Sequence, residues 1–417
     1  MNWDSTSESN VVYQKKGELT MKESRLAAGG TNLFQAIKAK CAEAEAAGIK
    51  LIKLSIGQPA GPALLSARKA AARAVMSGDE STHEYQDNGT PGVPDFAPRF
   101  VQANIKTYLT SRGGQVAFLP IPGIKPILGL VPLACGATAK TRINVRTATK
   151  PGYPTPADWC YYLGDMVWHH PICLNPENSF RFSPDQLDKE LKPHLVMMNY
   201  PHNPSGQVAS REWLEQLCTA AEQLNIRLFN DAAYTILAHS DEHCTLTDVA
   251  IDFPGLSWSE AFSASKAGNF TGWRIGAMVG SPDFIGDIAR IKGNTDSGFA
   301  APLAAGVIHA FENDRAGIEA VRQTYARRLE VLIEILTKHG LRLAVQPGAG
   351  FFTLWHRPKR AFGQEIKTAE QFNFLMIEKT GVVGVHFDPY IRYAVCTDVE
   401  AAAEEIDAAF AAAEISY

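Results

Sequence analysis

Short apolar runs that alternate with helical stretches constrain the fold of this chain more than any other feature. The runs typical of strands are 127–133, 195–199, 226–229, 261–264 and 275–279. Between them lie helical stretches such as the one that begins near Ser210 and Glu212. Such alternation predicts βαβ units around a mostly parallel sheet, in which polar residues just after the strands gather at one edge.

The chain has 417 residues, which is longer than a single hydrophobic core normally supports, so we expect two domains or one large domain with a satellite. A short apolar segment, 49–56, ends in the turn-rich sequence G-Q-P-A-G-P, which favours a boundary there. From residue 310 a long helical run, two alternating segments and an Ala/Glu-rich helix follow. The sequence therefore predicts a large α/β domain, 61–309, and a small α+β domain made of 1–60 and 310–417, with a polar N-terminal arm.

Composition narrows the class of partner. The net charge is −4, and no block of Lys and Arg is long enough to follow a phosphate backbone, so we expect no nucleic acid partner. No apolar run reaches eighteen residues and no secretory leader pattern is present, which predicts a cytoplasmic protein without a membrane partner. Seven scattered cysteines favour reduced thiols, and the histidines lack metal-binding spacing, so we expect no metal.

A candidate reactive lysine, Lys266, lies in the segment S-A-S-K-A-G-N-F-T-G-W-R, which also contains Arg274. A lysine after a strand and among small residues can approach a flat ligand, and desolvation can free its amine of a proton. Taken alone the segment is weak evidence, because most lysines are exposed at the surface. It gains weight as part of an ordered series after successive strands: Asn203, Asp231, Tyr234, Ser263, Lys266 and Arg274.

With these residues the chain resembles the class I and II aminotransferases, which are pyridoxal-phosphate enzymes of fold type I similar to aspartate aminotransferase. The resemblance extends from about residue 51 to residue 395 and includes the eight-residue step from Lys266 to Arg274. It implies a large domain with a mostly parallel sheet of the seven-stranded type, flanked by helices. It also implies a homodimer with shared active sites.

The resemblance assigns roles around the cofactor. Lys266 would form the Schiff base, and Asp231 would face the pyridine nitrogen. Tyr234 and Asn203 would contact the ring oxygen, and Tyr153 would stack on the ring. The phosphate would be bound by Ser263 and Arg274, by the turn 135–141 through Gly136, Ala137 and Thr138, and by Tyr85 from the neighbouring subunit.

For the substrate carboxylate, the resemblance implies a clamp of Gly57, Asn203 and Arg392. Plainer interpretations exist for single residues: Asp231 as a helix cap, Tyr234 as a core residue, and Arg392 as an exposed arginine on an edge strand. The Asn203–Pro204 bond is a candidate cis bond. Between residue 389 and Arg392 the chain is shorter than in the family. The resemblance therefore does not define the end of the pocket that would hold the substrate side chain.

The function predicted in this way is transamination from an amino acid to a 2-oxo acid, with 2-oxoglutarate as the expected acceptor. A β-lyase or a decarboxylase on the same scaffold would keep Lys266, Asp231 and Arg274, and a non-catalytic regulatory protein on this fold is a third alternative. The donor stays open among aspartate, an aromatic amino acid and diaminopimelate.

Overall fold

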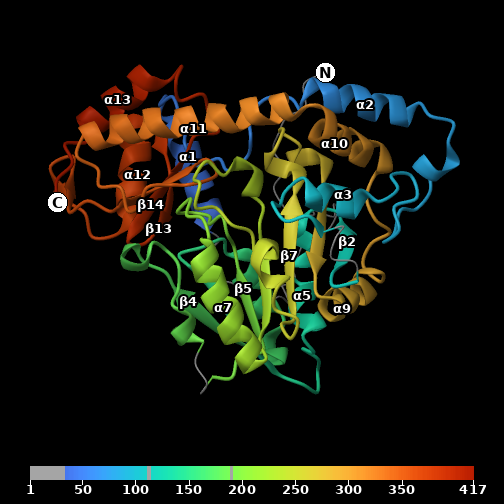
Figure 1. Ribbon diagram of the computed structural model, residues 1–417. Helices are drawn as coiled ribbons and strands as arrows, with labels where there is room; N and C mark the ends of the chain where they lie inside the picture. Colours follow the sequence, from blue (N-terminus) through green and yellow to red (C-terminus); the bar gives the residue numbers. More distant parts are fainter. Residues whose placement is uncertain (1–32, 110–113, 188–190) are drawn as a thin grey trace, which may run out of the picture.

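The computed structural model describes residues 33–109, 114–187 and 191–417. Within them a large sheet is covered by helices on both faces, and a smaller group of helices and strands lies beside it (Figure 1). The predicted N-terminal arm falls on residues 1–32, outside the described part.

Seven strands form the large sheet, in the spatial order β2-β8-β7-β6-β5-β3-β4. Neighbours pair in parallel except around β8, which runs antiparallel to β2 and β7. The carboxyl ends of β2, β7, β6, β5, β3 and β4 therefore share one edge. The predicted mostly parallel sheet is confirmed. The strands are β2 (Ala117–Ile121), β3 (Ile143–Lys150), β4 (Val167–Cys173), β5 (Leu195–Met198), β6 (Arg227–Asp231), β7 (Trp258–Ser263) and β8 (Gly276–Gly280).

Side chains of the strands alternate between two cores, as the two-residue period of a strand requires. In β5, Val196 and Met198 face one core, whereas Leu195 and Met197 face the other. The first core is covered by α2 (Leu65–Val75), α3 (Phe96–Gln102), α7 (Arg211–Leu224), α8 (Thr247–Ala250) and α10 (Ala301–Asn313). The second is covered by α4 (Ile124–Ile127), α5 (Leu130–Ala134), α6 (Thr155–Tyr162) and α9 (Pro282–Lys292).

The strand predicted at 127–133 is wrong. This stretch forms the end of α4 and most of α5. In the segment 124–134, the buried residues Ile124, Ile127, Leu128 and Val131 follow the spacing i, i+3, i+4, i+7, so they lie on one face of a helical path. Pro126 and Pro132 hide this period, yet each sits within the first turn of a short helix, where proline is tolerated.

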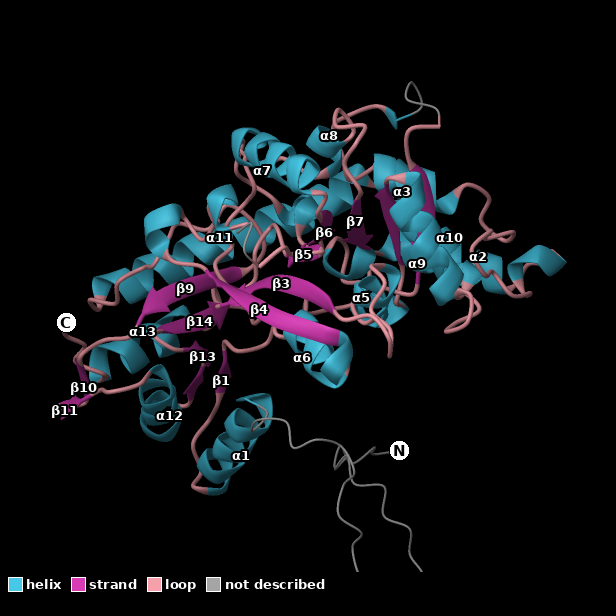
Figure 2. Cartoon of the chain, turned by 90° about the horizontal axis from the view of Figure 1, so that it is seen from below, coloured by secondary structure: helices cyan, strands magenta, loops and turns pink. Residues whose placement is uncertain are grey.

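Both ends of the described chain contribute to the smaller group of elements (Figure 2). β1 pairs in parallel with β12, and β13, β14 and β9 form an antiparallel sheet. The elements from the N-terminal side are α1 (Leu33–Ala46) and β1 (Ile52–Lys53). Those from the C-terminal side are α11 (Arg315–Lys338), β9 (Phe352–His356), β10 (Arg360–Ala361), β11 (Gln364–Glu365), α12 (Ala369–Thr380), β12 (Val382–Val383), β13 (Val385–Phe387), β14 (Tyr390–Ala394) and α13 (Ala403–Ala412).

The predicted division between residues 309 and 310 would cut α10, which packs along α2 of the large domain. Helix α11 is shared between the two cores. Ile318 belongs to the core that contains α10, whereas Tyr325 and Leu329 belong to the core of the smaller group. We therefore propose that the two domains divide inside α11, between Ile318 and Tyr325.

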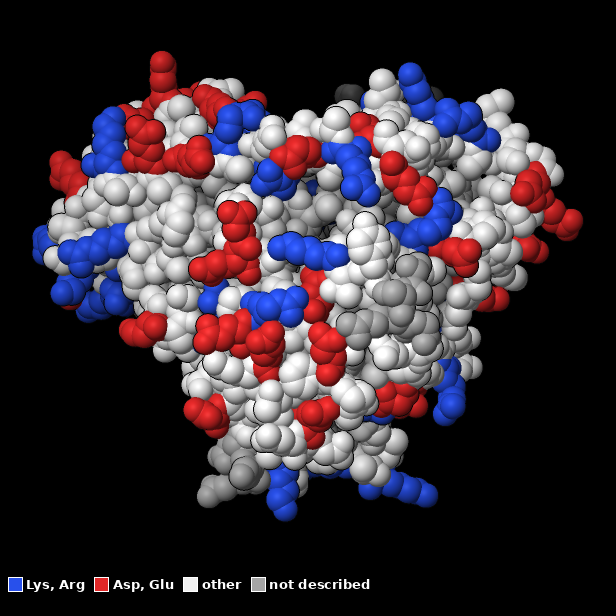
Figure 3. All heavy atoms as spheres, viewed as in Figure 1, with Lys and Arg blue, Asp and Glu red and all other residues white. Residues whose placement is uncertain are grey.

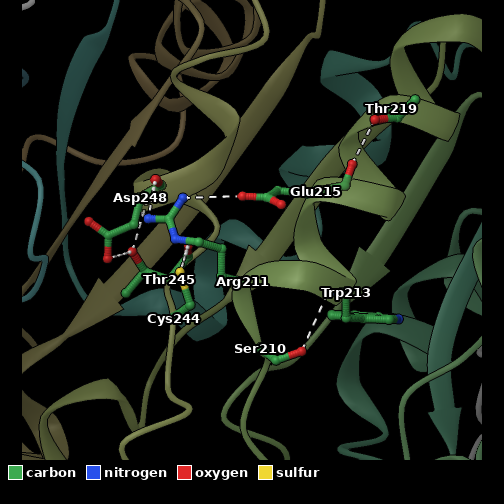
Figure 4. A network of polar contacts seen from close by, with 8 residues as sticks. All are labelled: Ser210, Arg211, Trp213, Glu215, Thr219, Cys244, Thr245 and Asp248. Carbon is green, nitrogen blue, oxygen red and sulfur yellow. Dashed lines mark hydrogen bonds and ion pairs between the residues drawn. The ribbon is translucent and has the colours of Figure 1, made fainter.

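Polar contacts fix the start of α7. The Ser210 hydroxyl accepts from Trp213 N at 3.4 Å, which confirms the predicted helix start. Arg211 donates to the backbone oxygen of Asp248 at 3.2 Å and thereby ties α7 to α8 (Figure 4).

On the face drawn in Figure 3, acidic and basic side chains are intermixed. No helix in the described ranges is both long and apolar enough to cross a membrane.

Replacing the buried Lys292 by methionine should destabilise the large domain. The lysine side chain is fully buried, and its ammonium lies 2.7 Å from Asp296 Oδ1 and 3.1 Å from Asn88 Oδ1. Lys292→Met leaves these acceptors without their cation, so we expect the free energy of unfolding to fall by about 3 kcal/mol in a urea titration. The matched control is Lys338→Met, because Lys338 lies 2.7 Å from Asp407 but is 62% exposed, and its loss should be below about 1 kcal/mol. Equal losses would contradict the prediction.

Candidate active site

A cavity of about 620 Å³ opens at the carboxyl edge of the large sheet, between this sheet and the elements α1, β9 and β14. It brings together most of the predicted site residues. Those that line it are Gly57, Tyr153, Asn203, Asp231, Tyr234, Ser263, Lys266, Arg274 and Arg392.

Lys266 lies in a single 3-10 turn directly after β7. Ser263 caps this turn, because its hydroxyl accepts from Ser265 N at 3.2 Å. The Lys266 amine donates to the backbone oxygen of Gly57 at 3.0 Å. Burial lowers the pKa of the amine, and the nearby Arg274 and Arg392 add to this shift, although Cys396 and Asp231 oppose it. The arrangement suits an amine that must lose its proton to act as a nucleophile.

Asp231 is the last residue of β6, and its carboxylate is buried in the floor of the cavity. Its side chain accepts from Ala233 N at 3.2 Å, and its backbone oxygen accepts from the Asn199 amide at 2.6 Å. Burial raises the pKa of Asp231 to about 7, against smaller lowering effects of the Ala233 amide and of Lys266. A buried carboxylate of this kind is strongly stabilised by a cationic group, so it fits a protonated ring nitrogen.

Tyr234 follows Asp231 by three residues, and its ring packs edge-on against Phe351 and Phe352 with centroids 5.6 Å apart in both cases. Burial raises the pKa of the Tyr234 phenol, so it stays protonated and can donate a hydrogen bond. Tyr153 is half-buried on the cavity wall. Burial also raises the pKa of Tyr153, while its hydrogen bond to Thr155 acts in the opposite direction.

Arg274 and the turn after β2 form another part of the wall. Arg274 is exposed at the cavity and donates to Thr271 O at 3.1 Å. Its guanidinium lies directly against Gly123, where a Cβ atom would come within 2.5 Å of Nη2. Gly123 has φ +81, which favours glycine. The following residues, Ile124 and Lys125, line the cavity.

Arg392 lies on β14, between β13 and β9, with its side chain almost fully buried. It donates to Asn203 Oδ1 at 3.0 Å and to Ser55 O at 2.9 Å, and its guanidinium lies 4.3 Å from the centre of the Phe352 ring. Burial lowers the pKa of Arg392 to about 10, so it remains charged at neutral pH. Because no described carboxylate pairs with it, the cavity can bind an anion here. The interpretation of Arg392 as an exposed edge-strand residue is wrong.

Four predicted site residues do not line this cavity. Gly136, Ala137 and Thr138 follow α5, and Ala134 at the end of that helix accepts from Arg227 at the amino end of β6. The turn is therefore at the sheet edge opposite Asp231, a displacement that follows from the helical conformation of 127–133. Tyr85 is 78% exposed on the surface of the chain. Its predicted role in a neighbouring subunit stays a prediction.

Two features of the site were not predicted from the sequence. One is the turn Gly123–Lys125, which could have been found as the glycine turn after the apolar run 117–121. The other is Asn199, which joins two predicted residues because its amide donates to Asp231 O and accepts from Asn203 N at 3.0 Å. The Asn203–Pro204 bond is cis, as predicted. The described residues contain no cluster of three or more metal-ligating side chains, and all seven cysteines are free.

Comparison with known proteins defines the family. The sequence profile of "Aminotransferase class I and II" matches residues 49–403. The chain belongs to this family. It is 30% identical to an LL-diaminopimelate aminotransferase of Methanocaldococcus jannaschii over 320 residues, which are 75% of this chain and 73% of the relative. A relative of the same name from Syntrophobacter fumaroxidans is 28% identical and covers 90% of this chain and 94% of its own length.

Solved structures show the same fold. The aspartate aminotransferase from Rhizobium meliloti superposes with a TM-score of 0.80 at 21% identity, over 95% of this chain and 99% of the other. That from Thermotoga maritima gives 0.74 at 20% identity, over 90% and 96%. The chain is thus a pyridoxal-phosphate-dependent aminotransferase. The buried Asp231 carboxylate and the close approach of Arg274 to Gly123 fit the ring nitrogen and the phosphate of this cofactor.

The stability of the cofactor-free protein should depend on pH through Asp231. Because burial raises the pKa in the folded state to about 7, the folded protein holds a proton between about pH 4 and 7 that the unfolded chain has lost. Stability due to this group therefore falls as pH rises through that window. At pH 8, Asp231→Asn should unfold at a higher temperature than the parent. At about 1.4 kcal/mol per pKa unit, its free energy of unfolding should be higher by a few kcal/mol at most. Near pH 4 the two proteins should have nearly the same stability. An equal difference at both pH values, measured by calorimetry, would contradict this.

Proposed function

We propose that this aminotransferase moves the amino group of a dicarboxylic amino acid to a 2-oxo acid, with 2-oxoglutarate as the expected acceptor. The observation that carries the proposal is one cavity in which the Lys266 amine, the Asp231 carboxylate and the Arg392 guanidinium converge. Bound through a Schiff base to Lys266, pyridoxal phosphate would supply the aldehyde that takes up the amino group and a ring that withdraws electrons from the α-carbon.

The chain's own residues would have separate tasks. Arg392 and Asn203 bind the α-carboxylate, as their hydrogen bond at 3.0 Å places them side by side. Lys266 Nζ, once released from the cofactor, takes the proton from the α-carbon, for which its lowered pKa suits it. Asp231 holds the charge of the ring nitrogen, and Tyr234 donates to the ring oxygen. Gly57 accepts from Lys266 through its backbone oxygen.

The mouth of the cavity supports a donor with a second carboxylate. Three exposed lysines line it, Lys38 from α1, Lys53 at the end of β1 and Lys125 after β2, whereas Asp231 is the only acidic residue among the described lining residues. Lys53 has a distant ion pair with Glu45, at 3.7 Å. The excess of positive charge attracts an anionic end group. Since the relatives above carry the name LL-diaminopimelate aminotransferase, we propose this compound as the first donor to test, ahead of aspartate and aromatic amino acids.

The two alternatives from the sequence have less support. The similar proteins named above are aminotransferases, so neither a β-lyase or decarboxylase nor a non-catalytic regulatory protein is favoured. Product analysis separates these reactions, because a lyase releases ammonia and pyruvate without an oxo-acid acceptor. A homodimer in which Tyr85 reaches the cofactor phosphate of the second copy is part of the proposal, and the cytoplasmic location stays a prediction.

Lys266→Ala should abolish transamination while the protein stays folded. A panel of LL-diaminopimelate, aspartate and phenylalanine is assayed with 2-oxoglutarate by the appearance of glutamate, and only the dicarboxylic donors should react well. We expect the turnover number of Lys266→Ala to fall by at least about 10³-fold, because both the covalent anchor and the base are removed. Lys359→Ala, an exposed lysine outside the cavity, is the control. Activity retained by Lys266→Ala, or a preference for phenylalanine, would overturn the respective part of the proposal.

Gly123→Ala should weaken cofactor binding, because a methyl group at that position displaces the Arg274 guanidinium. The matched control is Gly136→Ala. Gly136 also has a positive φ, +92 against +81, but a Cβ atom there would meet nothing within 4 Å. Both variants bear the backbone strain of alanine at positive φ. We expect the dissociation constant of pyridoxal phosphate, measured by absorbance titration, to rise about tenfold or more for Gly123→Ala alone. The reverse order would restore the turn 136–138 as the phosphate site.

A further inference from the structure

A buried carboxylate outside the cavity, that of Glu260 on β7, is linked to the site through hydrogen bonds. Its side chain is fully enclosed, with 0% exposed, and it has no ion pair with any described residue. Four donors converge on its two oxygens. They are Asn230 Nδ2 at 2.7 Å, Leu246 N at 3.0 Å, Thr247 N at 2.7 Å and Thr247 Oγ1 at 2.6 Å.

Asn230 is the cross-strand neighbour of Glu260, on β6 directly before Asp231. Its amide grips the backbone of Tyr200 on both sides: Oδ1 accepts from Tyr200 N and Nδ2 donates to Tyr200 O, each at 2.9 Å. The second Nδ2 hydrogen goes to Glu260. The amide oxygen and both amide hydrogens of Asn230 thus have partners. Tyr200 binds the oxygen and one hydrogen, and Glu260 binds the other hydrogen.

Tyr200 belongs to the segment that carries Asn203 to the cavity. On one side of Tyr200, the Asn199 side chain bridges Asp231 O, at 2.6 Å, and Asn203 N, at 3.0 Å. Asn203 Oδ1 in turn accepts from Arg392 at 3.0 Å. An unbroken series of contacts therefore leads from Glu260 through Asn230 and the segment 199–203 to the substrate clamp.

Burying a carboxylate without a cation is costly, and apolar residues of similar size usually fill a core equally well or better. Burial raises the pKa of Glu260 to about 7, although the Thr247, Asn230 and Leu246 donors all act against the shift. Stability alone thus gives little reason for a glutamate at this place. Placement of the segment 199–203 gives one.

We propose that Glu260 is a positioning residue that acts through Asn230 to hold Asn203 and Arg392 in the geometry that binds the substrate carboxylate. This rests on the proposed function, in which Arg392 binds that carboxylate. Loss of the contact should weaken binding of substrate in the ground state and the transition state alike. The Michaelis constant should therefore change more than the turnover number.

Glu260→Gln tests the inference with a minimal change of shape. Oε1 accepts from Asn230 and Leu246, and Oε2 accepts from Thr247 N and Oγ1. The new amide nitrogen therefore faces at least one N–H donor in either orientation, and the hydrogen bond from Asn230 is lost when the nitrogen takes the place of Oε1. In the cofactor-loaded enzyme we expect the Michaelis constant for the amino donor to rise about tenfold with a less than threefold change in turnover number. A second readout needs no turnover: calorimetric binding of maleate, an unreactive dicarboxylate, should weaken by a similar factor.

Asp248→Asn is the matched control, because Asp248 is also a buried carboxylate whose partners are backbone N–H groups and a hydroxyl. Its side chain accepts from Thr245 Oγ1 at 2.8 Å (Figure 4), Lys106 N at 3.0 Å and Thr107 N at 2.7 Å, and it does not line the cavity. This variant should lower the unfolding temperature as Glu260→Gln does, while the Michaelis constant and maleate binding stay unchanged. If both variants behave in this second way, the positioning role is refuted.

A double-variant cycle identifies the path. If Glu260 acts through Asn203, then Glu260→Gln added to Asn203→Ala should raise the Michaelis constant no further than Asn203→Ala alone, whereas additive effects would overturn the proposed path. Should Glu260→Gln fail to fold, Asn230→Ala must give the same rise, and an unchanged Michaelis constant there refutes the inference. Failure of the parent enzyme to transaminate or to bind maleate would instead reject the proposed function.

Discussion

The desolvated charges at the carboxyl edge of the large sheet determine how the rest of this molecule must be built. Lys266, Asp231 and Arg392 lie in one cavity, and burial shifts the pKa of each in the direction that favours its uncharged form. Such groups are stable only where backbone and side-chain partners are fixed in advance. The carbonyls of Ser55 and Gly57, the amide of Asn203 and the Ala233 N–H group provide these partners.

The sheet explains why residues far apart in sequence can share this environment. Strand β8 reverses direction between β2 and β7, so the end of β2, the start of β8 and the end of β7 meet at Ile121, Gly276 and Ser263. The approach of Arg274 to Gly123 and the position of Lys266 thus depend on one antiparallel strand. Each strand contributes alternate side chains to the cores on the two faces, so the sheet that carries this edge is packed from both sides.

Much of this could be predicted from the sequence, where local pattern and chemistry agree. The apolar runs before Asn203, Asp231 and Lys266 are buried strands, and each of these residues reaches the cavity. The strand predicted at 127–133 was wrong, because Pro126 and Pro132 obscure the helical period of α4 and α5. The phosphate-binding turn was therefore predicted at the wrong edge of the sheet. Asn199 and Glu260 had no signal in the sequence, because their importance comes from hydrogen bonds between neighbouring strands that only the fold brings together.

The pairing of β1 with β12 has a structural consequence. It attaches the segment 55–57 to the smaller domain, although this segment offers its carbonyl oxygens to Arg392 on β14 and to Lys266 of the large domain. The contact with Arg392 stays among the elements of the smaller group, whereas the contact with Lys266 joins that group to the large sheet. The same short segment thus spans the two parts of the site: its oxygens bind the Lys266 amine of the large domain and the Arg392 guanidinium on β14, and Asn203 Oδ1 of the large domain accepts from that guanidinium as well.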